Sequence, residues 1–447
     1  MGRRRKKLPE GEFIANILSL SHEGRGIAKI NNKTTFIQFG LPGEVVKFRY
    51  TYTRSKFDEG IVTEVIEESC DRVLPICEFY ESCGGCSLQH ISSEGQLTHK
   101  TNTIKEHFKH FGNVSPNHWI DPIKSENTIS YRSKARLGVR YVAKKDDRVL
   151  VGFRERNGRY LADISSCKVI DKSIGENLTS LQDLIRSMDA YSKIPQIEVA
   201  VDDNKTALII RHLEKLSKND LEKIKNYSNT YNFWIYLQAK GPDTIELLHP
   251  KIDKEYNFLE YSLPKYDISI RFQPNDFTQV NYSVNKKMIT QALDLMELKS
   301  TDRVLDLFCG LGNFSLPLAR NVSYVIGVEG NDAMVKRAFE SAANNNISNI
   351  DFYAANLFDE TITNHEWIEK DCNKILLDPP RAGAEIVCKN IDIFNVERIV
   401  YVSCNPSTLA RDAGILVNEK GYKMIKAGIM DMFPHTNHVE SMAVFIK

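Results

Sequence analysis

A pattern of strand, glycine-containing loop and helix recurs through the C-terminal part of the chain and constrains the fold most strongly. The segment "DRVLDLFCGLGNFSLPLAR" has an apolar strand at Val304–Leu307, then Gly310 and Gly312, then a helix expected to start near Asn313. Glycines at such a turn let a ligand approach the backbone closely. Repetition of this unit is typical of a parallel, doubly wound sheet. We therefore predict an α/β domain of Rossmann-like type over residues 266–447.

Chemically informative side chains follow three further strands of this predicted domain. The strand in "SYVIGVEG" ends in Glu329, about twenty residues beyond the glycine loop, where an acidic side chain can hold two ribose hydroxyls. The strands in "NKILLDPPRAGA" and "RIVYVSCNP" end at Asp378 and Cys404. Open α/β sheets bind ligands at the carboxyl ends of their strands, so we expect these residues to face one crevice. The loop is neither G-x-G-x-x-G nor a P-loop.

The first 265 residues contain two other kinds of pattern. Residues 9–70 alternate polar and apolar positions in short runs separated by glycine-rich turns, which predicts a small OB-like β-barrel. Residues 75–265 are mixed, with helices expected from about Glu94 to Phe111 and in "SLQDLIRSM" and "KNDLEKIKNYS". This region is predicted to be a mixed α+β central domain.

Composition narrows the location and the partners. The chain has 447 residues, 42% of them hydrophobic, but no apolar run of membrane-spanning length and no signal peptide. We expect a cytoplasmic protein that avoids membranes and, with no obligate protein partner indicated, a monomer. The net charge is only +1, yet residues 131–160 hold ten Lys/Arg against three Asp/Glu, interleaved with aromatic rings. Such a stretch suits single-stranded RNA, although it also fits a solvated sheet face.

Three cysteines lie close together in "CEFYESCGGC". Cys77, Cys83 and Cys86 are spaced C-x5-C-x2-C, and the two intervening glycines permit a sharp turn that can bring thiolates to one metal centre. A fourth ligand has to come from elsewhere, with Cys167 in "ISSCKVI" as the candidate. The spacing does not separate zinc from an iron-sulfur cluster.

The glycine loop resembles the S-adenosylmethionine loop of class I methyltransferases, and a cysteine at a strand end beside a loop for such a methyl donor has a specific chemical use. Carbon 5 of uracil is not nucleophilic by itself, but a thiolate that adds to carbon 6 converts the ring into an enolate that accepts a methyl group at carbon 5. A general base then removes the carbon-5 proton so that the thiol can leave. The segment "DMFPHTNHVESMAVF" offers Asp431, His435, His438 and Glu440 as candidate bases, and the residues alone do not choose among them.

Several motifs together resemble a known family. "FQPNDFTQVN", "LDLFCGLGNF", "LLDPPRAGA", "YVSCNPSTLARD" and "DMFPHTNHVES" are similar to the RNA uracil-5-methyltransferases, most of all the 23S ribosomal RNA branch, and the glycine loop resembles that of class I S-adenosylmethionine (SAM) methyltransferases. The pattern of "SHEGRGIAKI" and "LPGEVVKF" resembles the TRAM domain, an RNA-binding module. The resemblance spans nearly the whole chain.

The resemblance implies a function and a set of site residues. It implies SAM-dependent methylation of a uridine in 23S ribosomal RNA, expected at uridine 1939, with Cys404 as nucleophile and Glu440 as base. It also implies a 4Fe-4S cluster on the three clustered cysteines with Cys167 as fourth ligand. The cofactor contacts that it implies are Gln279, Phe308, Asn313, Glu329, Asn356 and Asp378.

Other functions fit the sequence less well. Asp-Pro-Pro also occurs in amino-methylating enzymes, but there an aromatic residue follows, where this chain has Arg381. A radical SAM enzyme usually has C-x3-C-x2-C, and this chain has five residues in the first gap. The same reaction on a different ribosomal or transfer RNA uridine, or a non-catalytic RNA-binding protein, are the remaining alternatives.

Overall fold

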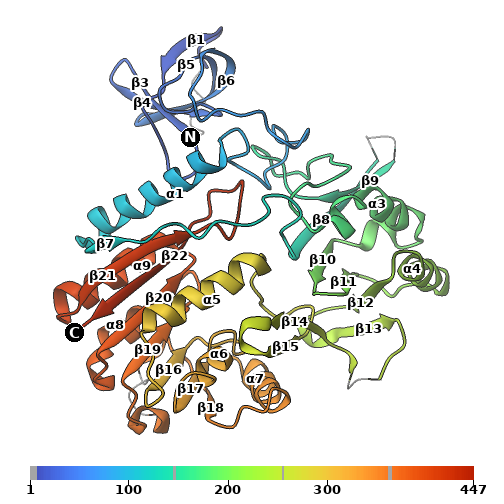
Figure 1. The fold of residues 1–447 in the computed structure, drawn as a ribbon. Coiled ribbons are helices and arrows are strands. Elements are labelled where there is room, and N and C mark those ends of the chain that lie inside the picture. Colours follow the sequence, from blue (N-terminus) through green and yellow to red (C-terminus); the bar gives the residue numbers. More distant parts are fainter. Residues whose placement is uncertain (1–7, 144–146, 254–255, 361–364) are drawn as a thin grey trace, which may run out of the picture.

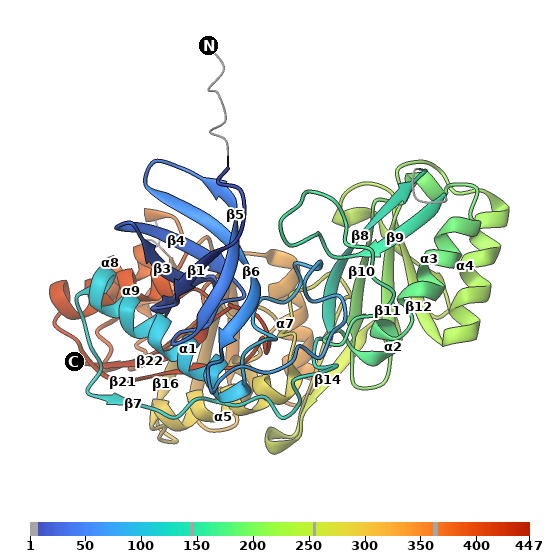
Figure 2. The ribbon, with the colours of Figure 1, turned by 90° about the horizontal axis from the view of Figure 1, so that it is seen from above.

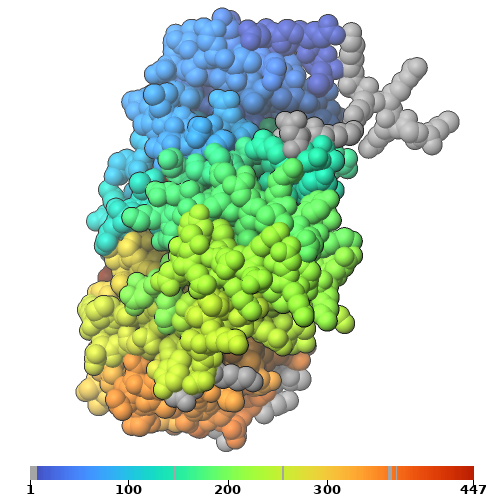
Figure 3. Space-filling model, turned by 90° about the vertical axis from the view of Figure 1, so that its right-hand side faces the viewer, coloured from blue at the N-terminus to red at the C-terminus, as the bar shows by residue number. Residues whose placement is uncertain are grey.

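The computed structural model describes residues 8–143, 147–253, 256–360 and 365–447. The described residues form three larger sheets, which follow one another along the chain, and a two-stranded sheet before the last of them. Figure 3 shows the corresponding parts from the blue N-terminal part through green to yellow and orange. Among the described residues, no helix combines the length and apolar character needed to cross a membrane.

The N-terminal sheet has six strands in the order β1-β5-β6-β4-β3-β2. It curls around Ile37, Val46 and Phe48, which are completely buried. Gly26 is required here because a Cβ atom at this position would lie 2.8 Å from the carbonyl oxygen of Gly40. The strands are β1 Phe13–Asn16, β2 Ser19–Leu20, β3 Gly26–Ile30, β4 Lys33–Gln38, β5 Val45–Thr53 and β6 Phe57–Glu67.

Helix α1 (Ser93–His107) follows the cysteine-rich loop and lies along the C-terminal sheet (Figure 1). It is capped by Ser92, whose hydroxyl accepts a hydrogen bond from the Gly95 N–H at 3.0 Å. A π-helical turn, η1 (Phe108–Gly112), extends it, in agreement with the predicted helix. Strand β7 (His118–Trp119) then joins the edge of the C-terminal sheet beside β21. This segment of the expected central region therefore packs on the C-terminal sheet.

The central sheet has the order β13-β12-β11-β10-β8-β9. Helices α3 and α4, both predicted, cover its outer side, away from the C-terminal sheet (Figure 2). The strands are β8 Lys134–Val142, β9 Arg148–Gly152, β10 Gln196–Val201, β11 Thr206–Arg211, β12 Phe233–Gln238 and β13 Ile245–His249. The helices are α2 Lys172–Gly175, α3 Leu178–Ser187 and α4 Lys218–Tyr231.

A hairpin connects the central part to the C-terminal sheet. Strands β14 (Leu259–Leu263) and β15 (Ile268–Phe272) pair antiparallel, and their buried residues join the core of the C-terminal part. The expected boundary between residues 265 and 266 thus falls inside this hairpin. Short 3-10 or π segments are η2 Tyr191–Lys193, η3 Pro242–Thr244, η5 Pro264–Tyr266, η7 Glu366–Glu369, η8 Ile391–Phe394 and η9 Ile415–Glu419.

The C-terminal sheet has eight strands in the order β18-β17-β16-β19-β20-β22-β21-β7. The first five are parallel, while β22 runs antiparallel to both neighbours. The strands are β16 Arg303–Leu307, β17 Tyr324–Glu329, β18 Ile350–Ala354, β19 Lys374–Leu377, β20 Arg398–Ser403, β21 Lys423–Met430 and β22 Glu440–Ile446. The helices are α5 Tyr282–Met296, α6 Ser315–Ala319, α7 Asp332–Asn344, α8 Glu385–Lys389 and α9 Pro406–Gly414.

This topology confirms the predicted α/β class and locates its crevice. The chain moves from β16 outward to β17 and β18, then returns to β19 on the other side of β16. Ligands of open α/β sheets bind at such a switch point, at the carboxyl ends of the strands. One local detail differs from prediction. The helix after the glycine loop begins at Ser315 instead of near Asn313, because Gly312, at φ +88°, still belongs to the turn.

Candidate active site

The loop after β16 is built from residues with left-handed backbone geometry. Phe308, Gly310 and Gly312 have φ values of +65°, +57° and +88°. The Gly310 N–H donates to a carboxylate oxygen of Glu329 at 3.2 Å, and the Asn331 N–H donates to the other at 3.1 Å. Glu329 therefore has a fixed orientation at the end of β17, next to the loop.

Asp306 is a buried acid under the same loop. Ser315 donates a hydrogen bond to one of its oxygens, while Oδ1 is buried without a partner among the described residues. Burial raises the pKa of Asp306 to about 8, with the nearby Asp378 and Glu329 charges contributing and the Ser315 hydrogen bond opposing the rise. An acid-rich wall with an unsatisfied oxygen favours a cationic ligand.

The other predicted cofactor residues have different surroundings. Asp378 directly follows β19, and burial raises its pKa to about 7. Asn356 is exposed beyond β18, and the half-buried Phe308 ring packs against Phe358 with centroids 5.5 Å apart.

Gln279 is half-buried in the loop between β15 and α5. The Asn313 side chain is held by Asn285 and Tyr261, since its Oδ1 accepts from Tyr261 Oη at 2.9 Å and from Asn285 Nδ2 at 3.0 Å.

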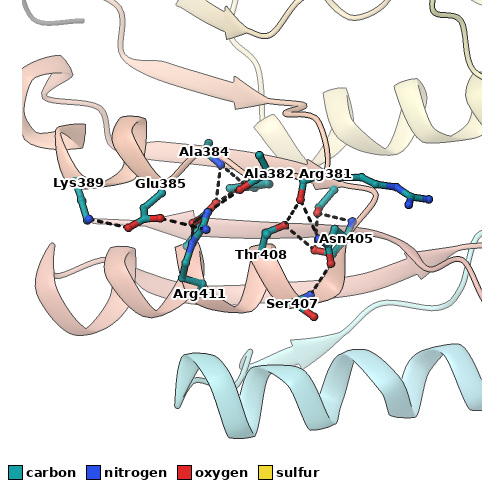
Figure 4. A network of polar contacts seen from close by, with 12 residues as sticks. Arg381, Ala382, Ala384, Glu385, Lys389, Asn405, Ser407, Thr408 and Arg411 are labelled. Carbon is teal, nitrogen blue, oxygen red and sulfur yellow. Dashed lines mark hydrogen bonds and ion pairs between the residues drawn. The ribbon is translucent and has the colours of Figure 1, made fainter. Parts of the chain in front are cut away.

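The residues after Cys404 form a rigid turn. The Asn405 side chain caps α9 by accepting from the Ser407 N–H at 3.1 Å, and Pro406 occupies the first helical position, where its missing N–H costs nothing. Asn405 Nδ2 also donates to the Arg381 carbonyl at 2.9 Å, as does Thr408 Oγ1 at 3.3 Å (Figure 4). These bonds join the turn after β19 to the turn that carries Cys404.

The strand register brings Cys404 and Glu440 together. The last recorded pair between β20 and the antiparallel β22 is Ser403 with Ser441. Cys404 directly follows β20 and Glu440 is the first residue of β22, so this register, extended by one residue, puts Cys404 opposite Glu440. Side chains directly opposite each other in an antiparallel pair share a face and have Cβ atoms about 4.5–5.5 Å apart. Of the four candidate bases, Glu440 is therefore the one placed across from the cysteine.

The electrostatics of this pair are dominated by burial. Burial raises the pKa of the Cys404 thiol to about 12, and the Glu440 and Asp378 charges contribute while Arg381 opposes the rise. Burial also raises the pKa of Glu440 to about 8, with Asp378 contributing and Arg381 and Lys100 opposing. Both groups respond to the same acid and the same arginine, which is consistent with one shared site.

The other candidate bases are engaged elsewhere. Asp431 accepts a hydrogen bond from the buried Lys100 ammonium at 2.7 Å. His435 is buried, and its ring Nδ1 lies 3.3 Å from Gln96 Nε2. The backbone N–H of His435 donates to Gln96 Oε1 at 2.8 Å. His438 is exposed, with Nδ1 3.3 Å from an Arg381 nitrogen.

The four predicted metal ligands line one pocket between the cysteine-rich loop and the turn before α2. Cys77, Cys83 and Cys86 come from the loop, and Cys167 lies across from them. Burial raises the pKa of Cys86 to about 12, and the charges of the other three cysteines contribute. Nevertheless, no group of three or more His, Cys, Asp or Glu side chains in the described ranges is arranged to hold a metal ion.

The cysteine-rich loop also contacts the segment that precedes Glu440. The N–H groups of Ser87 and Leu88 both donate to the His435 carbonyl, at 2.8 and 2.9 Å. In the other direction Arg156 donates to the carbonyls of Tyr80 and Cys86, each at 2.6 Å. The loop thus connects the central part to the candidate active site.

The basic stretch 131–160 is less available to RNA than its composition indicates. Arg136 pairs with Glu198 at 3.1 Å, and Arg148 pairs with Asp163 at 3.0 Å. Arg159 and Tyr160 are exposed and adjacent, with the guanidinium 5.4 Å from the ring centroid. Residues 144–146 of the stretch fall outside the described residues.

Comparison with known proteins identifies the family. The model of the tRNA (Uracil-5-)-methyltransferase family matches residues 92–447. The chain belongs to this family. The TRAM domain model matches residues 12–63, which contain most of the N-terminal sheet, as predicted.

Relatives within the family are similar over their whole length. A protein of Francisella tularensis subsp. novicida (strain U112), named 23S rRNA (uracil(1939)-C(5))-methyltransferase RlmD, is 56% identical over 100% of both chains. Proteins of the same name from Hahella chejuensis and Legionella pneumophila (strain Paris) are 48% and 50% identical over 100% and 97% of both chains. The crystal structure of Pyrococcus abyssi tRNA (uracil-54, C5)-methyltransferase with S-adenosyl-L-homocysteine has a similar fold, with a TM-score of 0.74 at 22% identity, covering 97% of this chain and 99% of that one.

Sequence reasoning missed one residue of the site. Lys100 lies on α1, far from the motifs in sequence, yet its side chain is completely buried beside Asp431. A lysine on a helix ordinarily faces solvent, so the sequence carries no signal for this position.

Proposed function

We propose that the protein transfers a methyl group from SAM to carbon 5 of a uridine in 23S ribosomal RNA, with uridine 1939 as the target. The observation that supports the chemistry is the pairing of Ser403 with Ser441, because the residues next to this pair are Cys404 and Glu440. The printed names of the relatives that are 48–56% identical over the full chain support the target. The family model is named for transfer RNA, so a transfer RNA uridine is the alternative.

In the proposed reaction, the Cys404 thiolate forms a bond to carbon 6 of a uracil that has been extruded from its stack. Carbon 5 then becomes nucleophilic and takes the methyl group, which SAM supplies as an electrophile. The Glu440 carboxylate removes the carbon-5 proton, the electrons of that bond restore the carbon 5–carbon 6 double bond, and the sulfur leaves carbon 6.

The site has to be completed by cations for this chemistry. With the pKa of Cys404 at about 12, only about one thiol in 100,000 is ionised at pH 7. The positive charge of a bound SAM and the Arg381 guanidinium both favour the thiolate. The acid-rich crevice that raises this pKa is thus suited to a cationic cofactor.

The proposed SAM contacts are the predicted ones. Glu329 would hold the ribose hydroxyls, and the loop at Phe308–Gly312 would allow close approach of the cofactor. The unpartnered Asp306 oxygen supports a ligand with hydrogen-bond donors above this loop. The remaining proposed contacts are Gln279, Asn313, Asn356 and Asp378.

We also propose that the cysteine pocket holds a 4Fe-4S cluster. Burial raises the thiol pKa values of Cys83, Cys86 and Cys167, and the charges of neighbouring cysteines add to the rise, so these groups are unfavourable as thiolates unless a cationic centre compensates them. In a cuboidal cluster each cysteine binds a different iron atom, so the four sulfur atoms stand farther apart than the ligands of a single ion. A cluster site is therefore consistent both with four cysteines in one pocket and with the finding that the described residues include no group arranged around a single metal ion.

The cluster proposal has a direct test with a matched control. Protein purified without oxygen is expected to be brown and to hold about four irons per chain. Cys83→Ser should lose iron, whereas Cys70→Ser, at an exposed cysteine outside the pocket, should keep it. Colourless wild-type protein with one zinc per chain would contradict the proposal.

The TRAM domain and the exposed Arg159 and Tyr160 are proposed to bind the ribosomal RNA, and the protein is proposed to act as a cytoplasmic monomer.

The function is tested with unmodified 23S ribosomal RNA, unmodified transfer RNA and SAM carrying a deuterated methyl group. Mass spectrometry of nucleosides and mapped fragments should find labelled 5-methyluridine at position 1939 of 23S RNA. Label confined to transfer RNA, or absent from both, would refute the proposal.

A further inference from the structure

Lys100 occupies an unusual place for a lysine. Its side chain is 0% exposed, and Nζ lies 2.7 Å from Asp431 Oδ1 and 2.9 Å from the Phe433 carbonyl oxygen. A buried ammonium costs several kcal/mol of desolvation unless it is well paired. Because burial of the Lys100 ammonium on α1 is costly, we expect its charge to have a function at the candidate active site.

The two groups that Lys100 binds belong to the loop that carries the proposed base. Met430, the last residue of β21, pairs with Glu440, the first residue of β22, so the loop 431–439 begins and ends beside the site. Lys100 binds the first half of this loop. Gln96, one turn earlier on α1, accepts the His435 N–H at 2.8 Å and so holds the second half.

The charge of Lys100 acts on Glu440. The charged or titratable groups around Glu440 are Asp378 after β19, Arg381 in the following turn, Cys404 after β20, Asp431, His435 and His438 in the loop 431–439, and Lys100 on α1. Burial and Asp378 raise the pKa of Glu440, and Arg381 and Lys100 lower it.

The two cations differ in their surroundings. Arg381 is exposed, so solvent and salt screen its charge and RNA can recruit it. Lys100 is fully buried and therefore acts at short range with little screening.

We propose that Lys100 is a positioning residue for methyl transfer, which fixes the loop 431–439 and whose buried positive charge favours the carboxylate form of Glu440, the form that accepts the carbon-5 proton. This inference rests on the proposed role of Glu440 as the base. Lys100 does not touch the substrate in this scheme. The carboxylate takes the proton, the electron pair forms the ring double bond, and the carbon–sulfur pair returns to Cys404.

The test separates methyl transfer from release. A single-turnover experiment follows the decay of the methylated protein-RNA adduct from about pH 6 to about pH 9.5, and the midpoint of the rate reports the ionisation of the base. Lys100→Met should raise the midpoint by at least about 0.3 pH unit, which slows release at pH 7 about twofold or more. Trapping by RNA that contains 5-fluorouridine should persist, because it needs no base. Lys100→Arg, which keeps the charge, should keep the wild-type midpoint even if release is slower overall.

Lys374 provides the matched control. It is also buried, at the amino end of β19 and so at the end of the sheet opposite the site, and its Nζ lies 2.7 Å from Asp302. Lys374→Met should lower the melting temperature without moving the midpoint. An unchanged midpoint in Lys100→Met would overturn the inference. The inference would also fail if Lys100→Met and Lys100→Arg slowed release equally and neither shifted the midpoint.

A second variant covers the case in which Lys100→Met does not fold. Lys100→Gln keeps a hydrogen-bond donor toward Asp431 and the Phe433 carbonyl but carries no charge, so the midpoint should rise as in Lys100→Met, and an unchanged midpoint would overturn the inference. Glu440→Gln separates the two proposals. If it releases product normally, the assignment of the base is wrong. If it stalls while the Lys100 profile is unshifted, only the inference about Lys100 fails.

Discussion

Replacing Glu440 with glutamine should make the free protein more stable at alkaline pH although it blocks product release. Burial and the Asp378 charge raise the pKa of Glu440 from its usual 4.5 to about 8. A carboxyl group with a raised folded-state pKa binds more protons when folded, so its contribution to stability is full below pH 4.5 and is lost as pH rises through 8. At about 1.4 kcal/mol per pKa unit, the loss amounts to at most about 5 kcal/mol.

Glutamine imitates the protonated acid but does not titrate. The free energy of unfolding of Glu440→Gln relative to wild type should therefore be near zero at about pH 5 and should grow by several kcal/mol by about pH 9, as measured by urea unfolding. Glu44→Gln is a contrasting control, since Glu44 is buried but bound by Arg72, and its loss should destabilise the protein. A pH-independent difference between Glu440→Gln and wild type would refute the reasoning about burial.

Two further predictions concern the cysteine turn and the RNA surface. Asn405→Ala removes the cap of α9 and the hydrogen bond to the Arg381 carbonyl. The free energy of unfolding should therefore fall by about 1 kcal/mol, and the rate of adduct formation should fall as well. Unchanged adduct formation would show that this turn does not position Cys404. Arg159→Ala should weaken RNA binding and reduce the slope of log K against log salt by about 1 with no change in melting temperature, whereas an unchanged slope would exclude a phosphate contact at this residue.

The parts of the site that depend on local sequence could be predicted. An apolar strand followed by a loop is a local pattern, so the strand ends at Leu307, Leu377 and Ser403 were recognisable, and parallel strands then bring the following residues to one edge. The start of α6 was predicted about two residues too early, because the left-handed turn at Gly312 depends on backbone geometry that the residue type only permits.

The parts that depend on long-range contacts could not be predicted from the residues. The choice of Glu440 among four candidate bases follows from the pairing of Ser403 with Ser441, and register between strands distant in sequence is set by the whole sheet. Lys100 is buried only because α1 packs on the loop 431–439, which no local pattern shows. For the same reason, the ion pairs of Arg136 and Arg148 were hidden in a stretch that reads as a free basic surface.

The central claim is that the Cys404 sulfur attacks the uracil ring, and intact-protein mass spectrometry tests it most directly. Wild-type protein is incubated with SAM and an RNA fragment that carries 5-fluorouridine at the target position, where fluorine cannot leave as a proton. The account predicts a stable species with the mass of protein, RNA and one methyl group, and digestion should place the link on Cys404. Cys404→Ala should bind SAM with wild-type affinity and form no such species. A covalent adduct or methyl transfer by Cys404→Ala would contradict the account.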